Sequence, residues 1–192
     1  MRKLLLLAFV MIGQVTLAQK KAAVMPEVPL VNGEIVYEKT FSAAGQSGTQ
    51  LYDNAENWFV KRYKSAEGIE VKNKATGRVV GNGTELLTFK GPLKRDVSCK
   101  VKMKIEIASK DGDYRVRISN IVYGYQAEPT DERTFFSAED LQKYVATGKK
   151  IKNAEGFNPI PFNKKQSLKA LGGLNPVIEN VMTSINQTMG GK

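Results

Sequence analysis

The chain has 192 residues, of which 42% are hydrophobic, and it carries a formal net charge of +10 with no histidine and a single cysteine. Without histidine, a Ser-His-Asp triad, a Cys-His pair and histidine-ligated metal sites are excluded. The basic balance favours anionic partners such as acidic glycans, anionic lipid heads or nucleic acid.

The first 18 residues have the three parts of a secretory signal peptide. Arg2 and Lys3 precede an apolar run over 4–12, and small and polar residues follow up to Ala18. The run is too short to span a bilayer, which needs about 20 apolar residues. We therefore expect an exported mature chain, periplasmic or extracellular, without a transmembrane segment. Its net charge would be +8, because the removed segment holds two of the 29 basic side chains and none of the 19 acidic ones.

The lone cysteine indicates the kind of organism. Cys99 cannot form an intramolecular disulfide, whereas secreted eukaryotic domains of this size usually contain several. We therefore interpret the chain as a bacterial envelope protein. An exported protein rarely meets nucleic acid, so no nucleic-acid partner is expected.

Residues 19–30 contain two prolines and are predicted to be an extended leader. A first strand is expected over 34–41. Ser47 and Gln50 then have the spacing of a capping box, which predicts a helix from about 48 to 65. Its apolar stripe consists of Leu51, Ala55, Trp58, Phe59 and Tyr63. Gly68 is placed to end this helix.

Several strand signals follow without a helix between them. Residues 69–72 alternate, and 78–87 are rich in β-forming residues. The triplet Gly81-Asn82-Gly83 interrupts the second run and suggests a bulge or a tight bend. Gly91-Pro92 marks the next loop.

The clearest strand covers 97–107, where six apolar residues alternate with mostly charged ones. Asp111-Gly112 is a strong signal for a two-residue hairpin. If Lys110 pairs with Asp113, Ile107 faces Val116, Ile105 faces Ile118, Glu106 faces Arg117 and Ala108 faces Arg115. Core then pairs with core and Glu106 with an opposite charge, so the register is self-consistent.

Residues 126–192 are predicted to form a C-terminal extension with a closing helix. An acidic connector lies at 128–132, Ser137 can cap a short helix to about Val145, and 147–163 have an irregular pattern. A last helix starts at Asn175-Pro176 and ends at Gly190-Gly191. Its apolar stripe consists of Val177, Ile178, Val181, Met182, Ile185 and Met189. The order of elements predicts an α+β fold of two layers, with helices packed on one face of a curved antiparallel sheet.

Residues 31–125 resemble the domain of a bacterial family of exported proteins of unknown function, whose fold is like half of the TATA-binding protein. The resemblance rests on Val31-Asn32-Gly33-Glu34-Ile35-Val36-Tyr37-Glu38-Lys39, Leu51-Tyr52, Trp58-Phe59, Lys74-Ala75-Thr76-Gly77-Arg78-Val79-Val80-Gly81-Asn82-Gly83 and Lys110-Asp111-Gly112-Asp113-Tyr114-Arg115. These motifs are turn glycines and core aromatics, so the resemblance implies a fold and no reaction. Likeness to a DNA-binding fold does not imply DNA binding.

The remaining chemical candidates have ordinary interpretations. Cys99 lies on the apolar face of its strand, so a buried thiol is favoured over a nucleophile. Asp111-Gly112-Asp113 is interpreted as a hairpin and not as a calcium loop. A 12-residue calcium loop that starts at Asp111 would need Glu at its last position, which is occupied by Val122. No metal or cofactor is expected.

The polar side of the two best strands is the one candidate binding surface. It carries Lys100, Lys102, Lys104, Arg115 and Arg117, with only Glu106 to offset them, and Lys72, Lys74 and Arg78 would extend it. The alternative is a solvated sheet face that uses lysine to stay soluble.

The leading interpretation is an exported, non-catalytic domain that binds or scaffolds in the bacterial envelope. Its partner would be an anionic envelope polymer or lipid, or another envelope protein. One alternative is a histidine-independent envelope hydrolase that uses carboxylates, such as Asp131 and Glu132, although nothing places two of them across a cleft. Another is a structural subunit that pairs through its exposed sheet.

Overall fold

The computed structural model describes residues 24–128, 130–152 and 159–190. The predicted signal peptide, residues 1–18, and the first five residues of the predicted leader, 19–23, lie outside these residues. Within them, no helix is long and apolar enough to cross a membrane.

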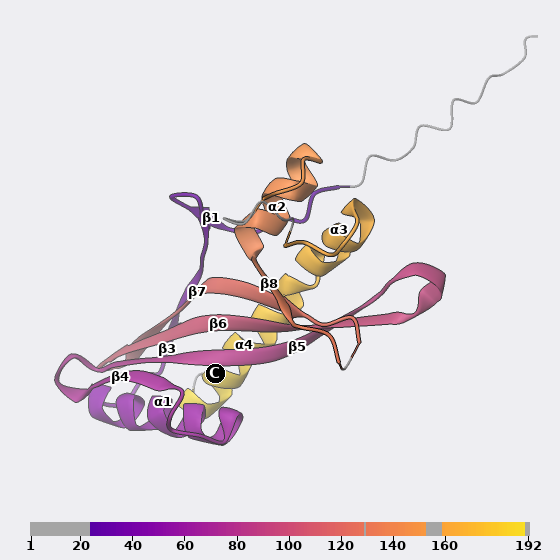
Figure 1. Ribbon diagram of the computed structural model, residues 1–192. Helices are drawn as coiled ribbons and strands as arrows, with labels where there is room; N and C mark the ends of the chain where they lie inside the picture. The colour runs from indigo at the N-terminus through magenta and orange to yellow at the C-terminus, as the bar shows by residue number, and fades with distance from the viewer. Residues whose placement is uncertain (1–23, 129, 153–158, 191–192) are drawn as a thin grey trace, which may run out of the picture.

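A six-stranded antiparallel sheet forms one layer of the molecule (Figure 1). Its spatial order is β3-β7-β6-β5-β4, and β8 pairs with the far end of β7. The strands are β3 (Tyr37–Ser42), β4 (Ile69–Asn73), β5 (Arg78–Lys90), β6 (Asp96–Lys110), β7 (Asp113–Tyr125) and β8 (Thr134–Ser137). Two short strands, β1 (Leu30–Val31) and β2 (Glu34–Ile35), form a separate ribbon. The α+β architecture expected from the sequence is therefore confirmed.

The first predicted strand, 34–41, is divided in two. Val36 lies between β2 and β3, where its N–H donates to the carbonyl oxygen of Pro29 at 3.1 Å. Val36 and its neighbour Ile35 are both buried, so side chains do not alternate at this point.

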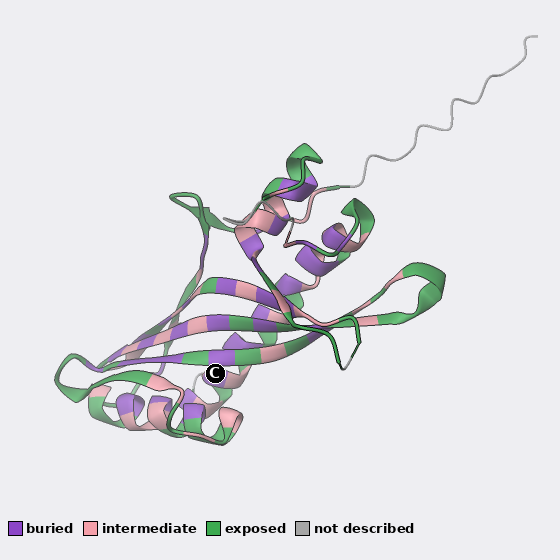
Figure 2. Cartoon of the chain, in the orientation of Figure 1, coloured by how far each residue is buried: buried purple, intermediate pink, exposed green. Residues whose placement is uncertain are grey.

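The β6–β7 hairpin has the expected register. Lys110 pairs with Asp113, Ile107 with Val116, Ile105 with Ile118, Glu106 with Arg117 and Ala108 with Arg115. Figure 2 shows the resulting bands of buried and more exposed residues along the strands. Alternation and an Asp-Gly turn together are sufficient to determine this pairing.

Two long helices pack on one face of the sheet. Helix α1 (Gly48–Tyr63) begins at the predicted capping box, in which Ser47 and Gln50 satisfy each other's backbone N–H groups. Helix α4 (Leu174–Met189) crosses beside it, and Trp58 of α1 donates to the hydroxyl of Ser184 of α4 at 3.0 Å. Helix α1 ends at Lys64, which adopts a left-handed conformation at φ 54°, and so stops before Gly68.

Gly81 and Gly83 do not break β5, contrary to the expectation of a bend there. Pairing of β5 with β6 runs without a shift from Arg78 to Lys90. The irregularity lies in β4, between Ile69 and Val71. A Cβ on Gly81 would lie 2.8 Å from the ring of Phe59, so this glycine allows α1 to approach the sheet closely.

Strand β7 contains a bulge that the sequence analysis missed. Lys104 pairs with Ser119 and Lys102 with Val122, so β7 has one extra residue, and Asn120 is left-handed at φ 50°. Before the bulge Ile118 is buried, and after it Ile121 and Tyr123 are buried. The bulge therefore exchanges the two faces of the last part of β7.

The segment after β7 contributes to the same hydrophobic core. Helix α2 (Ala138–Thr147) has the predicted Ser137 cap, whereas strand β8 and helix α3 (Lys164–Gly172) were not predicted. Helix α4 starts one residue before the predicted Asn175 and ends, as expected, at Gly190 in a left-handed conformation.

Candidate functional site

The five predicted cations lie on the face of the sheet opposite α1 and α4, which we call the open face. Lys100, Lys102 and Lys104 follow one another on β6, and Arg115 and Arg117 lie on β7 opposite Ala108 and Glu106, nearer the hairpin turn on the same face. All five are exposed or half-buried, because no helix of the described chain packs on this side. The structure therefore brings the predicted residues together on one surface.

The expectation of a single acid on this surface is wrong. Strand β3 brings Glu38 to Arg115 and Arg117, with N···O distances of 3.7 and 3.4 Å. Strand β4 brings Glu70 to Lys104, at 2.9 Å. Since both acids are more than 30 residues distant in sequence, only the folded sheet places them there.

The hydrogen bonds on this face lower two carboxyl pKa values. Arg78 donates twice to Glu106, at 2.9 Å each, and this hydrogen bonding lowers the pKa of Glu106. Hydrogen bonds from Lys104 and Asn82 lower the pKa of Glu70. Arg78, Lys104, Arg115 and Arg117 are thus engaged with acids at one end of the open face.

Lys72 and Lys74 do not extend the open face, contrary to expectation. Lys72 pairs with Glu56 of α1 at 3.1 Å, and Lys74 pairs with Asp53 of α1 at 2.7 Å. The irregularity in β4 between Ile69 and Val71 precedes them, and both ion pairs lie on the helix side of the sheet.

Lys100 and Lys102 form the unbalanced end of the open face. Both are exposed, and in the described part of the chain neither makes a salt bridge. The ammonium group of Lys102 lies 4.7 Å from the centre of the Phe135 ring, a cation–π contact. Phe135 belongs to β8 and lies next to Gly124, where a Cβ would approach within 3.0 Å of the ring.

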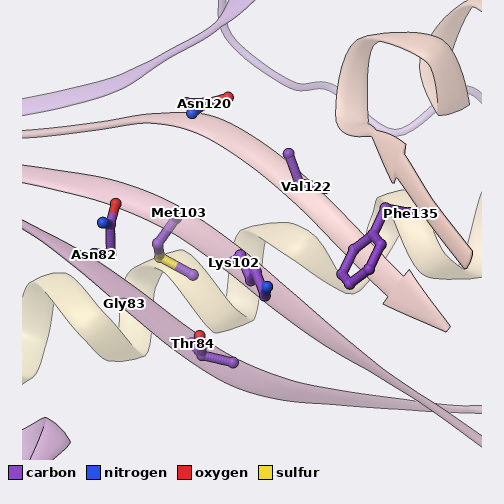
Figure 3. Close-up of a pocket in the computed structure, with 8 residues that line it drawn as sticks. All are labelled: Asn82, Gly83, Thr84, Lys102, Met103, Asn120, Val122 and Phe135. Carbon is purple, nitrogen blue, oxygen red and sulfur yellow. The ribbon is translucent and has the colours of Figure 1, made fainter. Parts of the chain in front are cut away.

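A pocket of about 490 Å³ opens beside this pair (Figure 3). Eight residues of β5, β6, β7 and β8 line it: Asn82, Gly83, Thr84, Lys102, Met103, Asn120, Val122 and Phe135. None of the eight is acidic. The bulge at Asn120 shapes this pocket, because it turns Val122 to the open face and presents the Asn120 side chain at its rim.

Phe135 and Asn120 were missed by sequence reasoning. The run Thr134-Phe135-Phe136 is rich in β-forming residues and was a signal for a short strand, but it was too short to stand out. For the extra residue of β7, the signal was the change of phase in the apolar alternation, from Val116 and Ile118 to Ile121 and Tyr123 across Asn120.

The other candidate groups have structural roles. Cys99 is 2% exposed, and burial raises the pKa of its thiol to about 12, which removes the thiolate needed by a nucleophile. An Asp111 carboxylate oxygen accepts from the Gly48 N–H at the start of α1. Asp131 accepts from the Glu128 N–H within its own turn. The described residues contain no cluster of three or more potential metal ligands among His, Cys, Asp and Glu.

Two neighbouring carboxylates do line a different pocket, of about 450 Å³, at the N-terminus of α2. Glu139 accepts from the Ile35 N–H at 2.7 Å, so this side chain fastens the β2 ribbon to α2. The neighbouring Asp140 lies in the first turn of α2. Consecutive helical residues diverge by about 100°, so the two carboxylates do not oppose each other across a cleft.

Comparison with known proteins identifies the fold. Residues 37–124 match a family described as a domain of unknown function (DUF4468) with TBP-like fold. Among curated proteins, none matches this chain. This match confirms the resemblance inferred from the sequence, which was to a family of unknown function with a TBP-like fold.

Solved structures agree with the family match. A crystal structure of a DUF4468 family protein from Bacteroides ovatus has a TM-score of 0.64 and 20% identity, over 90% of this chain and 93% of that chain. A crystal structure of a TBP-like protein from Parabacteroides distasonis has a TM-score of 0.62 and 18% identity, over 84% of this chain and 96% of that chain. At these identities the likeness shows a shared fold, so function must be argued from the surface.

Proposed function

We propose that this protein, whose residues 37–124 carry a DUF4468 domain, is an exported, non-catalytic module that binds an anionic polymer of the bacterial envelope. The unbalanced end of the open face, Lys100 and Lys102, makes the contact. In this role the domain holds or scaffolds envelope material and does not transform it.

The observation that carries the proposal is the uneven pairing of charge on the open face. Four of its cations already face carboxylates, whereas Lys100 and Lys102 have no acidic partner in the described chain. Two unpaired, adjacent cations create a local positive potential that attracts anions and is screened by salt.

The chemistry of the chain supports binding over catalysis. There is no histidine, and burial raises the pKa of the single thiol to about 12. The pocket beside Lys102 contains no carboxylate, so it lacks the acid and base that a histidine-free hydrolase would need.

Export is tested by N-terminal sequencing of the protein recovered from its own host. Cleavage before Gln19 and recovery outside the cytoplasm are the expected results. An intact N-terminus at Met1 on protein recovered from the cytoplasm would contradict the proposal.

Binding is tested with an acidic polysaccharide, polygalacturonate, as the probe for the mature chain at low salt. The double variant K100Q/K102Q should bind about tenfold more weakly, and added salt should weaken the wild type steeply. The matched control K72Q/K74Q removes the same two charges from the helix side and should bind like the wild type. Circular dichroism checks that both variants are folded.

Equal losses in the two variants would show that net charge, and not the open face, drives association. Binding to phosphatidylglycerol vesicles alone would assign the face to lipid. No binding to either probe at low salt would overturn the proposal.

A further inference from the structure

We propose that the pocket beside Lys102 is a subsite for one acidic sugar unit, a ring that bears hydroxyl groups and a carboxylate or phosphate. This inference rests on the proposed function and names the chemistry that the pocket selects. At about 490 Å³ the pocket is within the size range of small-molecule sites.

The pocket has an apolar side and a polar side. Val122 and Phe135 lie together at one end, with Met103 in the floor (Figure 3). Asn82 and Asn120 approach from the other end, from β5 and β7, and Thr84 lies on the β5 side. A ligand that fits this arrangement has one apolar surface and several hydrogen-bonding groups along its edge.

The polar side has unused hydrogen-bonding capacity. Asn82 donates through Nδ2 to Glu70 at 2.7 Å, which orients its amide and leaves Oδ1 as an acceptor. In the described chain, the side chains of Asn120 and Thr84 make no hydrogen bond. Amides and hydroxyls both donate and accept, as the hydroxyl groups of a sugar require.

The charge is located at one point of the rim. Lys102 is held over Phe135, and Lys100 precedes it on the same face of β6. No carboxylate lines the pocket, so an anionic substituent meets no like charge there. Because Lys102 covers one face of the Phe135 ring, a flat aromatic ligand such as a nucleobase would have to displace the ammonium group to stack on that face.

The pocket thus calls for a ligand with an apolar surface, several hydrogen-bonding groups and one anionic group. A sugar ring with an acidic substituent has all three. Its C–H surface packs on Val122 and the edge of Phe135, its hydroxyl groups reach Asn82, Thr84 and Asn120, and its anionic group reaches Lys102. A lipid phosphate satisfies only the charge.

The test separates ring recognition from charge recognition. The variant T84V/N120G keeps every charge, keeps a β-branched residue in β5, and keeps a residue suited to the left-handed bulge. Trigalacturonate, its neutral counterpart trigalactose, and tripolyphosphate are compared by isothermal titration with the mature wild-type chain and this variant.

The wild type should prefer trigalacturonate to the two other probes by about tenfold. T84V/N120G should lose that preference while its weak binding of tripolyphosphate is unchanged. Amide chemical shifts in the wild type should move at Asn82, Thr84, Asn120 and Val122.

Three results distinguish the possible failures. Equal affinity of the wild type for trigalacturonate and tripolyphosphate would overturn the sugar subsite and leave the proposed function intact. If T84V/N120G bound trigalacturonate as tightly as the wild type does, the sugar subsite would likewise be overturned and the proposed function would stand. Absence of binding by trigalacturonate, tripolyphosphate and polygalacturonate together would overturn both.

Discussion

Gly83 of β5 lies directly against Tyr63 of α1, so that a Cβ on Gly83 would come within 2.9 Å of Tyr63 Cζ. The same added carbon would lie 2.7 Å from Cδ1 of Ile105. The hydroxyl group of Tyr63 donates to Glu85 at 3.0 Å, which fixes the ring in this place. The distance between the helix layer and the sheet is thus set at a position without a side chain.

The variant Gly83→Ala should destabilise the protein by about 1–3 kcal/mol, the range for overpacking a filled core. Urea unfolding followed by circular dichroism measures this change. The neighbouring Thr84→Ala is the control, because Thr84 is exposed, and it should change the free energy of unfolding by less than about 0.5 kcal/mol. Equal stability of Gly83→Ala and the wild type would show that α1 shifts freely over the sheet.

Truncation of Ile105 tests the assignment of the core face. Ile105 is completely buried in the same cluster as Trp58 and Phe59. Ile105→Ala should therefore cost about 2–5 kcal/mol in urea unfolding, through lost burial and the cavity left behind. Leu93, which is 87% exposed, provides the control, and Leu93→Ala should be nearly neutral. A loss below about 0.5 kcal/mol for Ile105→Ala would contradict the assignment.

The thiol of Cys99 should be unreactive in the folded protein. Burial limits access and raises the thiol pKa to about 12, so at about pH 8 almost no thiolate forms. Ellman's reagent should label native protein only slowly and denatured protein to one thiol per chain. Rapid stoichiometric labelling of the native protein would restore the nucleophile interpretation.

Acid should remove the stabilisation that Arg78 gives through Glu106. Hydrogen bonding to Arg78 lowers the folded-state pKa of Glu106, so its stabilisation is complete above the unfolded-state value of about 4.3. It is lost as the pH falls through the lower folded-state pKa. The wild type should therefore exceed Arg78→Gln in stability at neutral pH, and the difference should shrink below about pH 4. A stability difference between the wild type and Arg78→Gln that increased as the pH fell would contradict this prediction.

Local patterns were sufficient to predict the centre of the fold. The β6–β7 register follows from strict alternation and the Asp111-Gly112 turn, since a slip by one residue would bury Arg115 and Arg117. The start of α1 follows from Ser47 and Gln50, which satisfy each other within four residues.

Features that depend on distant segments were not predictable in the same way. Glu38 reaches Arg117 because β3 pairs with β7 across almost 80 residues of sequence, and no local pattern encodes that pairing. Glycines such as Gly81 and Gly83 are found in strands that bend and also in strands that a helix approaches closely, so the sequence alone does not distinguish the two cases. Only the aromatic rings of α1, packed against them, distinguish the two cases.

The bulge at Asn120 makes the outward surface of β7 depend on how the strand pairs as well as on its composition. If β7 paired with β6 without the bulge, Asn120 would lie opposite Met103 and every later side chain of β7 would turn over. Tyr123, now fully buried against Phe136, would then face water, and Val122 and Gly124 would take its place inside. A shift of one residue in pairing, with no change in sequence, would thus erase the pocket beside Lys102 and part of the core together.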